Sequence, residues 1–249
     1  MLDFGFYNMD CMNGMKEFPD NFFDLAIVDP PYGNGVVNLQ AAKDSAEGST
    51  STERIRGGLH YQRKNCRKPD GTWGYANWRD VGDEVCKKII AWDVAPEKDY
   101  FEELFRVSRN QIIWGGNYFE LPPTRCFLIW RKLTISESFS MAMCEYAWTS
   151  FNDNAKMYEC APQDPTGKRF HPTQKPIALY DWILSKYAKE GYKILDTHVG
   201  SGSSLIACKR RNHDFVGFEI DEEYYKKAKE RIERETAQMS IFDFGISPY

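Results

Sequence analysis

Short runs of apolar residues recur along the chain, bounded by glycine, proline or charged residues. Such runs predict buried β-strands. We expect strands at residues 25–29, 111–115, 126–130, 192–196 and 214–220, with weaker candidates at 3–9 and 145–151.

Four segments between these runs carry apolar residues at helical spacing. They are residues 96–108, 176–188, 203–211 and 222–236. The second begins with Pro176, which suits the first turn of a helix because no N–H is needed there. Strands that alternate with helices predict an α/β fold, in which a mostly parallel sheet is covered by helices on both faces.

Two polar segments, residues 33–78 and 152–175, interrupt this pattern. Long irregular segments in a compact domain are usually functional or disordered. The first segment contains a basic run without an acid, which suits DNA phosphates, and a solvated loop is the alternative. The run comprises Arg54, Arg56, Arg63, Lys64, Arg67 and Lys68.

Composition narrows the class of protein. The 249 residues suffice for one large α/β domain, and 42% of them are hydrophobic. A net charge of −4 excludes a basic coat over the whole surface but permits a local basic groove. The 7 cysteines form no CxxC pair and the 4 histidines are scattered, so we expect reduced thiols and no metal site. No apolar run nears the roughly 18 residues of a membrane span, so we expect a soluble, cytoplasmic protein.

The segment "YKILDTHVGSGSSLIACKRR" predicts a strand, a glycine-rich turn and a helix. Gly200 and Gly202 let the backbone approach a ligand, and Asp196 at the strand end can bind an ammonium group. Glu219 ends the next strand and can accept hydrogen bonds from ribose hydroxyls. Leu205 replaces the third glycine of a dinucleotide fingerprint, which favours a nucleoside without a pyrophosphate, such as S-adenosylmethionine (AdoMet). A plain tight turn is the alternative.

The motif "HPTQKP", residues 171–176, comes just before the expected helix at 176–188. Lys175 offers a mobile positive charge that suits a ligand carboxylate. The alternative is a proline-bounded loop with a solvated lysine.

The stretch "LAIVDPPYGNG" places Asp29, Pro30, Pro31 and Tyr32 directly after a predicted strand. The prolines restrict φ, so the Asp29 carboxylate and the Pro30 carbonyl are held beyond the strand end, where open α/β sheets bind ligands. Two such acceptors suit the exocyclic –NH2 of a base, whose lone pair then points toward a methyl donor, and Tyr32 can stack on the ring. A base in a duplex must flip out to reach them. A proline turn capped by Asp29 is the alternative.

Together these motifs resemble the AdoMet-dependent DNA amino-methyltransferases, which make N6-methyladenine or N4-methylcytosine. Their order resembles the permuted β group, because "DPPY" precedes "HPTQKP" and "LDTHVGSGS". The resemblance implies a single Rossmann-like methyltransferase domain over residues 1–249, with a seven-stranded, mostly parallel sheet, one antiparallel strand and neighbouring chain ends. It also implies inserted DNA-recognition loops at about 36–80 and 133–170.

The family roles carry over by position as implications of the resemblance. The catalytic motif is Asp29, Pro30, Pro31 and Tyr32. The residues implied around AdoMet are Asp10, Cys11, His171, Thr173, Lys175, Asp196, His198, Gly200, Gly202, Ser203 and Glu219. One departure is that Thr and His follow the strand Asp, where the family usually has Phe or a small residue. That leaves the role of His198 open.

The first residue of the catalytic motif bears on the target base. Asp at this position is typical of adenine enzymes, and Ser of cytosine enzymes. We therefore expect a site-specific DNA methyltransferase acting on N6 of a flipped-out adenine, with N4 of cytosine as the alternative. The resemblance implies double-stranded DNA as the partner and S-adenosylhomocysteine as the product, with a homodimer and a cognate restriction endonuclease as candidates by analogy.

Other functions fit these residues less well. A cytosine-5 methyltransferase needs a catalytic Cys, usually after Pro, and the chain has no Pro-Cys pair. Methyltransferases of RNA or protein glutamine usually place the glycine-rich turn first. A nicotinamide-dependent oxidoreductase would use the same turn, but Leu205 opposes it. An inactive DNA-binding module is disfavoured because each expected catalytic position is filled.

Overall fold

The computed structural model describes residues 1–33, 65–67, 73–75, 93–137, 142–162, 170–171 and 173–237. The chain forms two compact units. The first comprises Met1–Pro30, Glu97–Thr134 and Met143–Tyr249, and the second comprises Pro31–Pro96 and Ile135–Ala142. In the second unit, β3 (Asn65–Arg67) pairs antiparallel with β4 (Trp73–Tyr75). Most of the expected loop 36–80 lies outside the described residues, and the single domain with inserted loops stays a prediction.

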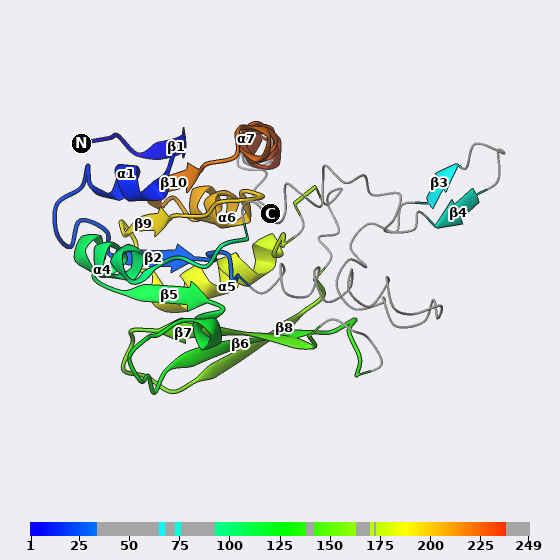
Figure 1. Cartoon of the computed structure of the whole chain (residues 1–249), viewed down its shortest axis with the longest axis horizontal. Coiled ribbons are helices and arrows are strands. Elements are labelled where there is room, and N and C mark those ends of the chain that lie inside the picture. Colours follow the sequence, from blue (N-terminus) through cyan, green and yellow to red (C-terminus); the bar gives the residue numbers. More distant parts are fainter. Residues whose placement is uncertain are drawn as a thin grey trace, which may run out of the picture. The chain divides into compact units, whose positions relative to one another are not determined.

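Eight strands of the first unit form one sheet (Figure 1). Of these strands, only β7 runs opposite to its neighbours, β5 and β6. The α/β fold with a mostly parallel sheet and one antiparallel strand is therefore confirmed. In sheet order the strands are β1 (Gly5–Asn8), β10 (Asp214–Glu219), β9 (Lys193–Asp196), β2 (Leu25–Val28), β5 (Gln111–Trp114), β7 (Cys144–Thr149), β6 (Phe127–Lys132) and β8 (Lys156–Cys160).

The expected number of seven strands is wrong, because β8 lies in a segment expected to be a loop. β8 is the outermost strand of the sheet and pairs in parallel with β6, with Lys156 opposite Leu128. Its residues alternate between half-buried and exposed. An edge strand of this kind has no continuous apolar run, so the pattern that marks the central strands is missing.

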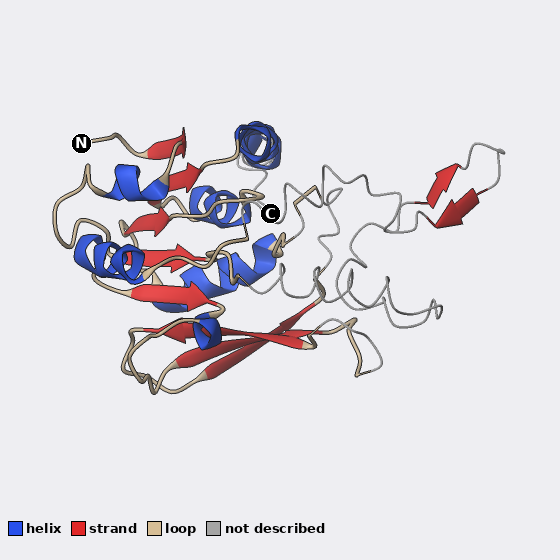
Figure 2. Ribbon diagram, in the orientation of Figure 1, coloured by secondary structure: helices blue, strands red, loops and turns tan. Residues whose placement is uncertain are grey.

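Helices cover both faces of the sheet (Figure 2). On β2, Leu25 and Ile27 enter one core while Ala26 and Val28 enter the other, because successive side chains of a strand point to opposite faces. None of the described helices combines the length and apolarity that a membrane span requires. The first face carries α5 (Ile177–Tyr187), α6 (Ser203–Arg210) and α7 (Glu222–Ala237), and the second carries α1 (Cys11–Met15) and α4 (Lys98–Val107).

The last described helix packs against the first strand. β1 pairs in parallel with β10, and the rings of Phe6 on β1 and Tyr225 on α7 have centroids 4.6 Å apart. The Tyr225 hydroxyl also donates a hydrogen bond of 3.3 Å to the Phe6 carbonyl. The permuted motif order predicts this neighbourhood of α7 and β1. Residues 238–249 lie outside the described residues, so the distance between the chain ends stays a prediction.

Candidate active site

Four neighbouring parallel strands carry an acid at or just after their carboxyl ends. Glu219 ends β10 and Asp196 ends β9. Asp29 directly follows β2, and Asp10 lies shortly after β1. Parallel strands end at one edge of a sheet, which we call the carboxyl edge, and begin at the opposite edge, which we call the amino edge. The acids that the sequence indicated therefore share the carboxyl edge.

Asp29 belongs to a line of four alternating charges. Its Oδ2 accepts a hydrogen bond from Lys175 Nζ, which lies 3.2 Å from Glu145 Oε2. Glu145 Oε1 lies 2.6 Å from Lys132 Nζ. Lys175 is 4% exposed, with Nζ 5.2 Å from the centroid of the Trp114 ring, within cation–π range. The alternative of a solvated lysine is therefore wrong. We call Lys132, Glu145, Lys175 and Asp29 the charge line.

The two inner groups of the charge line stabilise each other's charged forms. Burial alone would lower the pKa of Lys175, but Asp29 and Glu145 outweigh burial and raise that pKa above its usual value. Burial would raise the pKa of Glu145, but Lys175 and Lys132 lower it. Buried charges are tolerated when each has such a partner. Lys175 and Glu145 are therefore both charged at neutral pH.

The glycine-rich turn needs its glycines. Gly200 (φ +54°) and Gly202 (φ +80°) adopt left-handed backbone conformations that side chains disfavour. A Cβ on Gly200 would lie 3.1 Å from His171 Cε1, and one on Gly202 would lie 3.0 Å from Ile232 Cγ1. The turn thus presents bare backbone immediately before α6.

Leu205, at the position of the missing third glycine, is fully buried. A Cβ on Gly217 of β10 would lie 2.8 Å from Leu205 Cδ1 and 2.7 Å from Val199 Cγ2. The glycine that allows helix and strand to approach closely is therefore on β10, and the leucine fills the space above it.

The Glu219 carboxylate is oriented by the backbone of this turn. Its Oε2 accepts a hydrogen bond of 2.9 Å from Gly200 N, and its Oε1 accepts one of 2.9 Å from Asp221 N. Burial raises the pKa of Glu219, and these two hydrogen bonds oppose that effect. Each oxygen of an ionised carboxylate has more than one acceptor site, so Glu219 can still accept from a ligand diol.

Asp196 is the most deeply buried acid of the carboxyl edge, at 2% exposure. Its Oδ1 accepts a hydrogen bond of 3.0 Å from His198 N, and its Oδ2 accepts one from the Ser204 hydroxyl. Burial raises the pKa of Asp196 to about 7 and outweighs the two hydrogen bonds, which lower it, while the charges of Asp29 and Glu219 add smaller upward contributions. Asp196 therefore changes charge near neutral pH.

The unusual Thr-His pair joins the turn to α4. Thr197 Oγ1 lies 2.6 Å from the hydroxyl of Tyr100 and 2.9 Å from His198 Nδ1. The rings of Tyr100 and His198 meet edge to face, 5.5 Å between centroids. Burial lowers the pKa of His198 to about 4, so this imidazole is neutral. Tyr100 therefore contacts the residues that follow β9. It was not predicted from the sequence, because there it was only one of the regularly spaced apolar residues of a helix.

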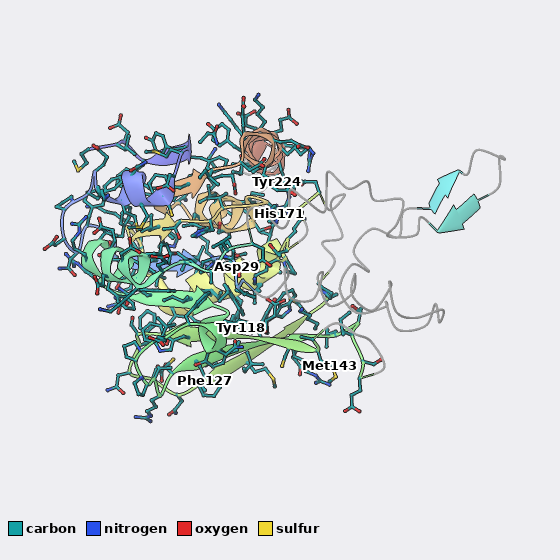
Figure 3. The ribbon with its side chains drawn as sticks, viewed as in Figure 1. Asp29, Tyr118, Phe127, Met143, His171 and Tyr224 are labelled. Carbon is teal, nitrogen blue, oxygen red and sulfur yellow. The ribbon has the colours of Figure 1, made fainter. Side chains whose placement is uncertain are left out.

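The His171 side chain contacts the start of α7. Its ring lies edge to face on Tyr224 at 4.4 Å, and its Nδ1 lies 3.2 Å from Thr173 Oγ1 (Figure 3). Together with the close approach to Gly200, these contacts hold the HPTQKP loop against the glycine-rich turn.

A buried arginine connects the same two segments from α7. Arg231 Nη1 donates hydrogen bonds of 2.9 Å to Ser201 O and 2.8 Å to Ser203 Oγ. The Ser203 hydroxyl in turn donates one of 2.7 Å to Lys175 O. Arg231 was not predictable from the sequence, because its charge resembles the other charges of an exposed helix face.

Asp10 and Cys11 begin α1. Asp10 is the N-cap, and its Oδ1 accepts a hydrogen bond of 3.1 Å from Asn13 N. Burial, and then the charge of Asp10, raise the pKa of Cys11 to about 12. Cys11 is therefore a protonated thiol at neutral pH.

The remaining expected site residues belong to the second unit or lie outside the described residues. Pro31 and Tyr32 belong to the second unit, where Gly33 N donates a hydrogen bond of 3.1 Å to Asp93 Oδ1. Of the basic run, only the backbone of Arg67 is described, and the others lie outside the described residues. Within the described residues no group of His, Cys, Asp or Glu could hold a metal ion.

Comparison with known proteins identifies relatives. A family model described as DNA methylase matches residues 58–230, more than half of the 249 residues. The type II methyltransferase M.HpaI of Haemophilus parainfluenzae is 45% identical over 65 residues, which is 26% of this chain and 21% of that protein. The chain thus matches about a fifth of that relative. The putative methylase YubD of Escherichia coli (strain K12) is 22% identical over 236 residues, covering 91% of this chain and 89% of that protein.

A solved structure shares the fold. The PvuII DNA methyltransferase (cytosine-N4-specific) aligns with a TM-score of 0.52 and 12% identity, covering 96% of this chain and 93% of that chain. At this level of identity the likeness concerns the fold alone.

Proposed function

The chain belongs to the DNA methylase family, and we propose that it transfers the methyl group of AdoMet to the exocyclic N6 of an adenine in double-stranded DNA. The observation that carries this proposal is the row of acids at the carboxyl edge. In that row the Asp29 carboxylate is held by Lys175 directly before Pro30. An ionised, oriented carboxylate at this edge suits an –NH2 group that must donate hydrogen bonds.

The residues of the carboxyl edge fit AdoMet. Its ammonium, ribose hydroxyls and adenine amine are hydrogen-bond donors, and carboxylates are acceptors. We assign these donors to Asp196, Glu219 and Asp10 in that order. A further acceptor, Gln174 Oε1, is buried without a hydrogen-bond partner in the described part of the chain, beside Lys175.

We assign the remaining expected contacts to the walls of the same site. This assignment follows from the chain segments that approach one another around the glycine-rich turn. When bound, AdoMet supplies an electrophilic methyl group on a sulfonium sulfur. We assign to its surroundings Cys11, His171, Thr173, Lys175, His198, Gly200, Gly202 and Ser203.

The catalytic motif acts on the base. The Asp29 carboxylate and the Pro30 carbonyl accept hydrogen bonds from the amine, so that its lone pair points toward the methyl group. As the N–C bond forms, the S–C bond breaks and its electron pair stays on sulfur, giving S-adenosylhomocysteine. The amine then loses one proton, with Asp29 as the acceptor directly or through water. Tyr32 stacks on the flipped-out base.

The test is incorporation of a tritiated methyl group from AdoMet into unmethylated double-stranded DNA. Digestion to nucleosides and mass spectrometry then identify the product. We expect N6-methyladenine; N4-methylcytosine would replace adenine by cytosine as the substrate. Absence of both, with NAD binding in place of AdoMet binding by calorimetry, would refute the methyltransferase proposal.

Asp29→Ala separates catalysis from cofactor binding. We expect the rate of methyl transfer to fall by at least ~100-fold, because an acceptor for the reacting amine is lost. The dissociation constant for AdoMet should stay within about twofold of the wild-type value, a difference well below 1.4 kcal/mol. Transfer at the wild-type rate would remove Asp29 from the reaction.

A further inference from the structure

The charge line joins three separate parts of the first unit to the catalytic motif. Lys132 ends β6, Glu145 lies on β7, and Lys175 precedes α5. The side chains of Lys132, Glu145, Lys175 and Asp29 are 8%, 24%, 3% and 12% exposed. Nothing in the proposed reaction requires the two residues of the antiparallel part of the sheet. Their burial beside Lys175 therefore needs an explanation.

We propose that Lys132 and Glu145 are positioning residues that divide the positive charge of Lys175 between Glu145 and Asp29, and so set how strongly the Asp29 carboxylate accepts hydrogen bonds from the base. The proposal rests on the proposed function, since it gives a role to these residues in methyl transfer. It also gives Lys175 a second role besides the expected contact with AdoMet.

The four charges of the line balance one another in a poorly solvated place. The line holds two cations and two anions, so its net charge is zero when all are ionised. The Lys175 ammonium lies between two carboxylates and over the ring of Trp114, and its Nζ contacts both acids. Interactions between buried charges are weakly screened. A change at one end of the line is therefore felt at the other.

The charges of Glu145 and Lys132 have opposite effects on how strongly Lys175 interacts with Asp29. Without the negative charge of Glu145, Lys175 interacts more strongly with Asp29, so Asp29 binds protons less readily and becomes a weaker acceptor. Without the positive charge of Lys132, Glu145 competes more strongly for Lys175, so Asp29 binds protons more readily. Removing the charges of both Glu145 and Lys132 leaves Lys175 and Asp29, whose charges sum to zero.

Other titratable groups surround the same place. Asp196 on β9 interacts electrostatically with Asp29, and the hydroxyls of Tyr100 on α4 and Tyr180 on α5 do so as well. The pKa of each tyrosine is raised well above its usual value by burial, so both stay neutral. Asp196 is the same residue in every variant, so it is common to all of the proteins compared.

The same strands provide a matched control. Arg131, next to Lys132 on β6, pairs with Glu159 of β8 at 2.7 Å. Their side chains are 55% and 41% exposed, and an exposed pair is screened by water. Glu159→Gln removes an acid from an ion pair of this sheet without touching the charge line.

The experiment measures the pH dependence of kcat for methyl transfer to DNA in the full chain. Glu145→Gln should lower kcat about tenfold and move the acidic limb of the profile about one pH unit down. Lys132→Met should move that limb up. The double variant should return to within about threefold of the wild-type kcat, and to its midpoint. Glu159→Gln should match the wild type, and AdoMet binding should be unchanged throughout.

Opposite displacements with recovery in the double variant would support the charge line. Displacements in the same direction, or none beyond that of Glu159→Gln, would overturn it, because a purely structural role predicts equal losses. If a single variant did not fold, the double variant would provide the test. The charge line predicts that the double variant folds and that the acidic limb of its pH profile has the wild-type midpoint. A wild-type chain that methylates no DNA would instead overturn the proposed function, and the charge line with it.

Discussion

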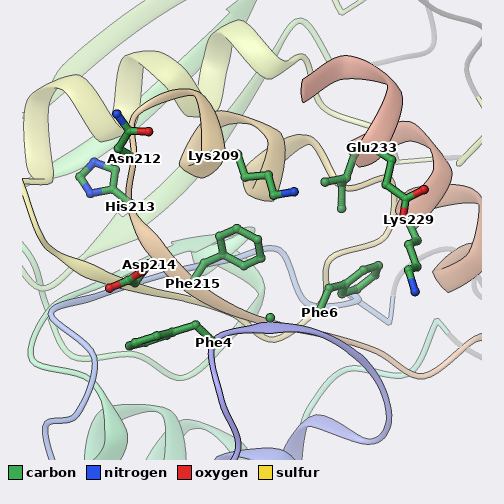
Figure 4. A pocket seen from close by; sticks show the side chains of 11 residues that line it. Phe4, Phe6, Lys209, Asn212, His213, Asp214, Phe215, Lys229 and Glu233 are labelled. Atoms are coloured by element: carbon green, nitrogen blue, oxygen red, sulfur yellow. The ribbon is translucent and has the colours of Figure 1, made fainter. Parts of the chain in front are cut away.

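The two edges of the sheet hold their charges in different ways. At the carboxyl edge, Asp196 and Lys175 are 2% and 4% exposed and bind fixed partners. At the amino edge lies a groove of about 610 Å³ with exposed charges of both signs above an aromatic floor (Figure 4). Its lining includes Phe4, Phe6, Phe215, Lys209, Asp214, Lys229 and Glu233.

Strand direction explains the difference. The segments after parallel strands turn into helix N-termini, so their backbone N–H groups orient the acids, as at the turn before α6. At the amino edge α6 ends, and its last-turn Lys209 extends into water. A solvated charge of this kind is screened and has no fixed direction. We therefore expect substitutions to couple stability and AdoMet binding only at the carboxyl edge.

The largest expected effect concerns the pH dependence of stability and Asp196. Its pKa is raised from 3.8 to about 7, so the folded state binds the extra proton, and its stabilising effect is lost as pH rises from about 4 to 7. Over that window the wild type should lose about 4 kcal/mol more of its unfolding free energy than Asp196→Asn. Urea denaturation at several pH values measures the difference. Asp214→Asn at the amino edge should keep the wild-type slope, and equal slopes for all three proteins would contradict the assignment.

Substitution of two glycines with positive φ, one at each edge of the sheet, allows the two edges to be compared directly. Gly200→Ala should lower the unfolding free energy by about 3 kcal/mol, because backbone strain adds to crowding against His171. Gly191 (φ +77°), just before β9, has no atom within 4 Å of an added Cβ, so Gly191→Ala should cost only about 1 kcal/mol. Calorimetry should show weaker AdoMet binding for the first variant alone. Equal binding losses would mean that the carboxyl edge has no special role.

Arg231→Met tests whether α7 supports the site. The variant removes a buried charged donor to Ser201 and Ser203 and should cost about 2 kcal/mol of unfolding free energy. AdoMet binding should weaken as well, because Ser203 also holds the Lys175 backbone. Arg234, on the same helix and 57% exposed, provides the control, and Arg234→Met should change neither quantity by more than about 0.5 kcal/mol.

The central strands and the carboxyl edge were predictable from the sequence because their signals are local. β2 (LAIV) is a continuous apolar run, and β5 (QIIW) and β9 (KILD) contain shorter ones, as expected for strands buried on both faces. The acids follow such runs, and parallel topology brings them together without any knowledge of contacts. The shift of the close-packing glycine from the turn to Gly217 was not visible, because it depends on which side chain lies above that strand.

The partners of the acids were not predictable, because they come from distant segments. Lys175 is 146 residues from Asp29 in the sequence, and the HPTQKP motif indicated it as a partner for a ligand carboxylate rather than for Asp29. One signal was present: Lys132 and Glu145 lie at the ends of apolar strand runs, and charges that become buried there must be paired. The short helix α1 and the outermost strand β8 were not predicted for a different reason: the hydrophobic patterns of their own residues are weak.

The smallest expected effect belongs to the groove at the amino edge. Lys209→Gln combined with Lys229→Gln removes two exposed cations from its lining. The unfolding free energy should change by less than about 0.5 kcal/mol, because exposed side chains lose little when their charge is removed. AdoMet binding and methyl transfer at physiological salt should equal those of the wild type. A rise in KM for DNA that disappears at low salt would show that the groove contacts phosphates, because counterion release makes such contacts salt-dependent. Both edges of the sheet would then take part in function, and the contrast between them would hold for AdoMet but not for DNA.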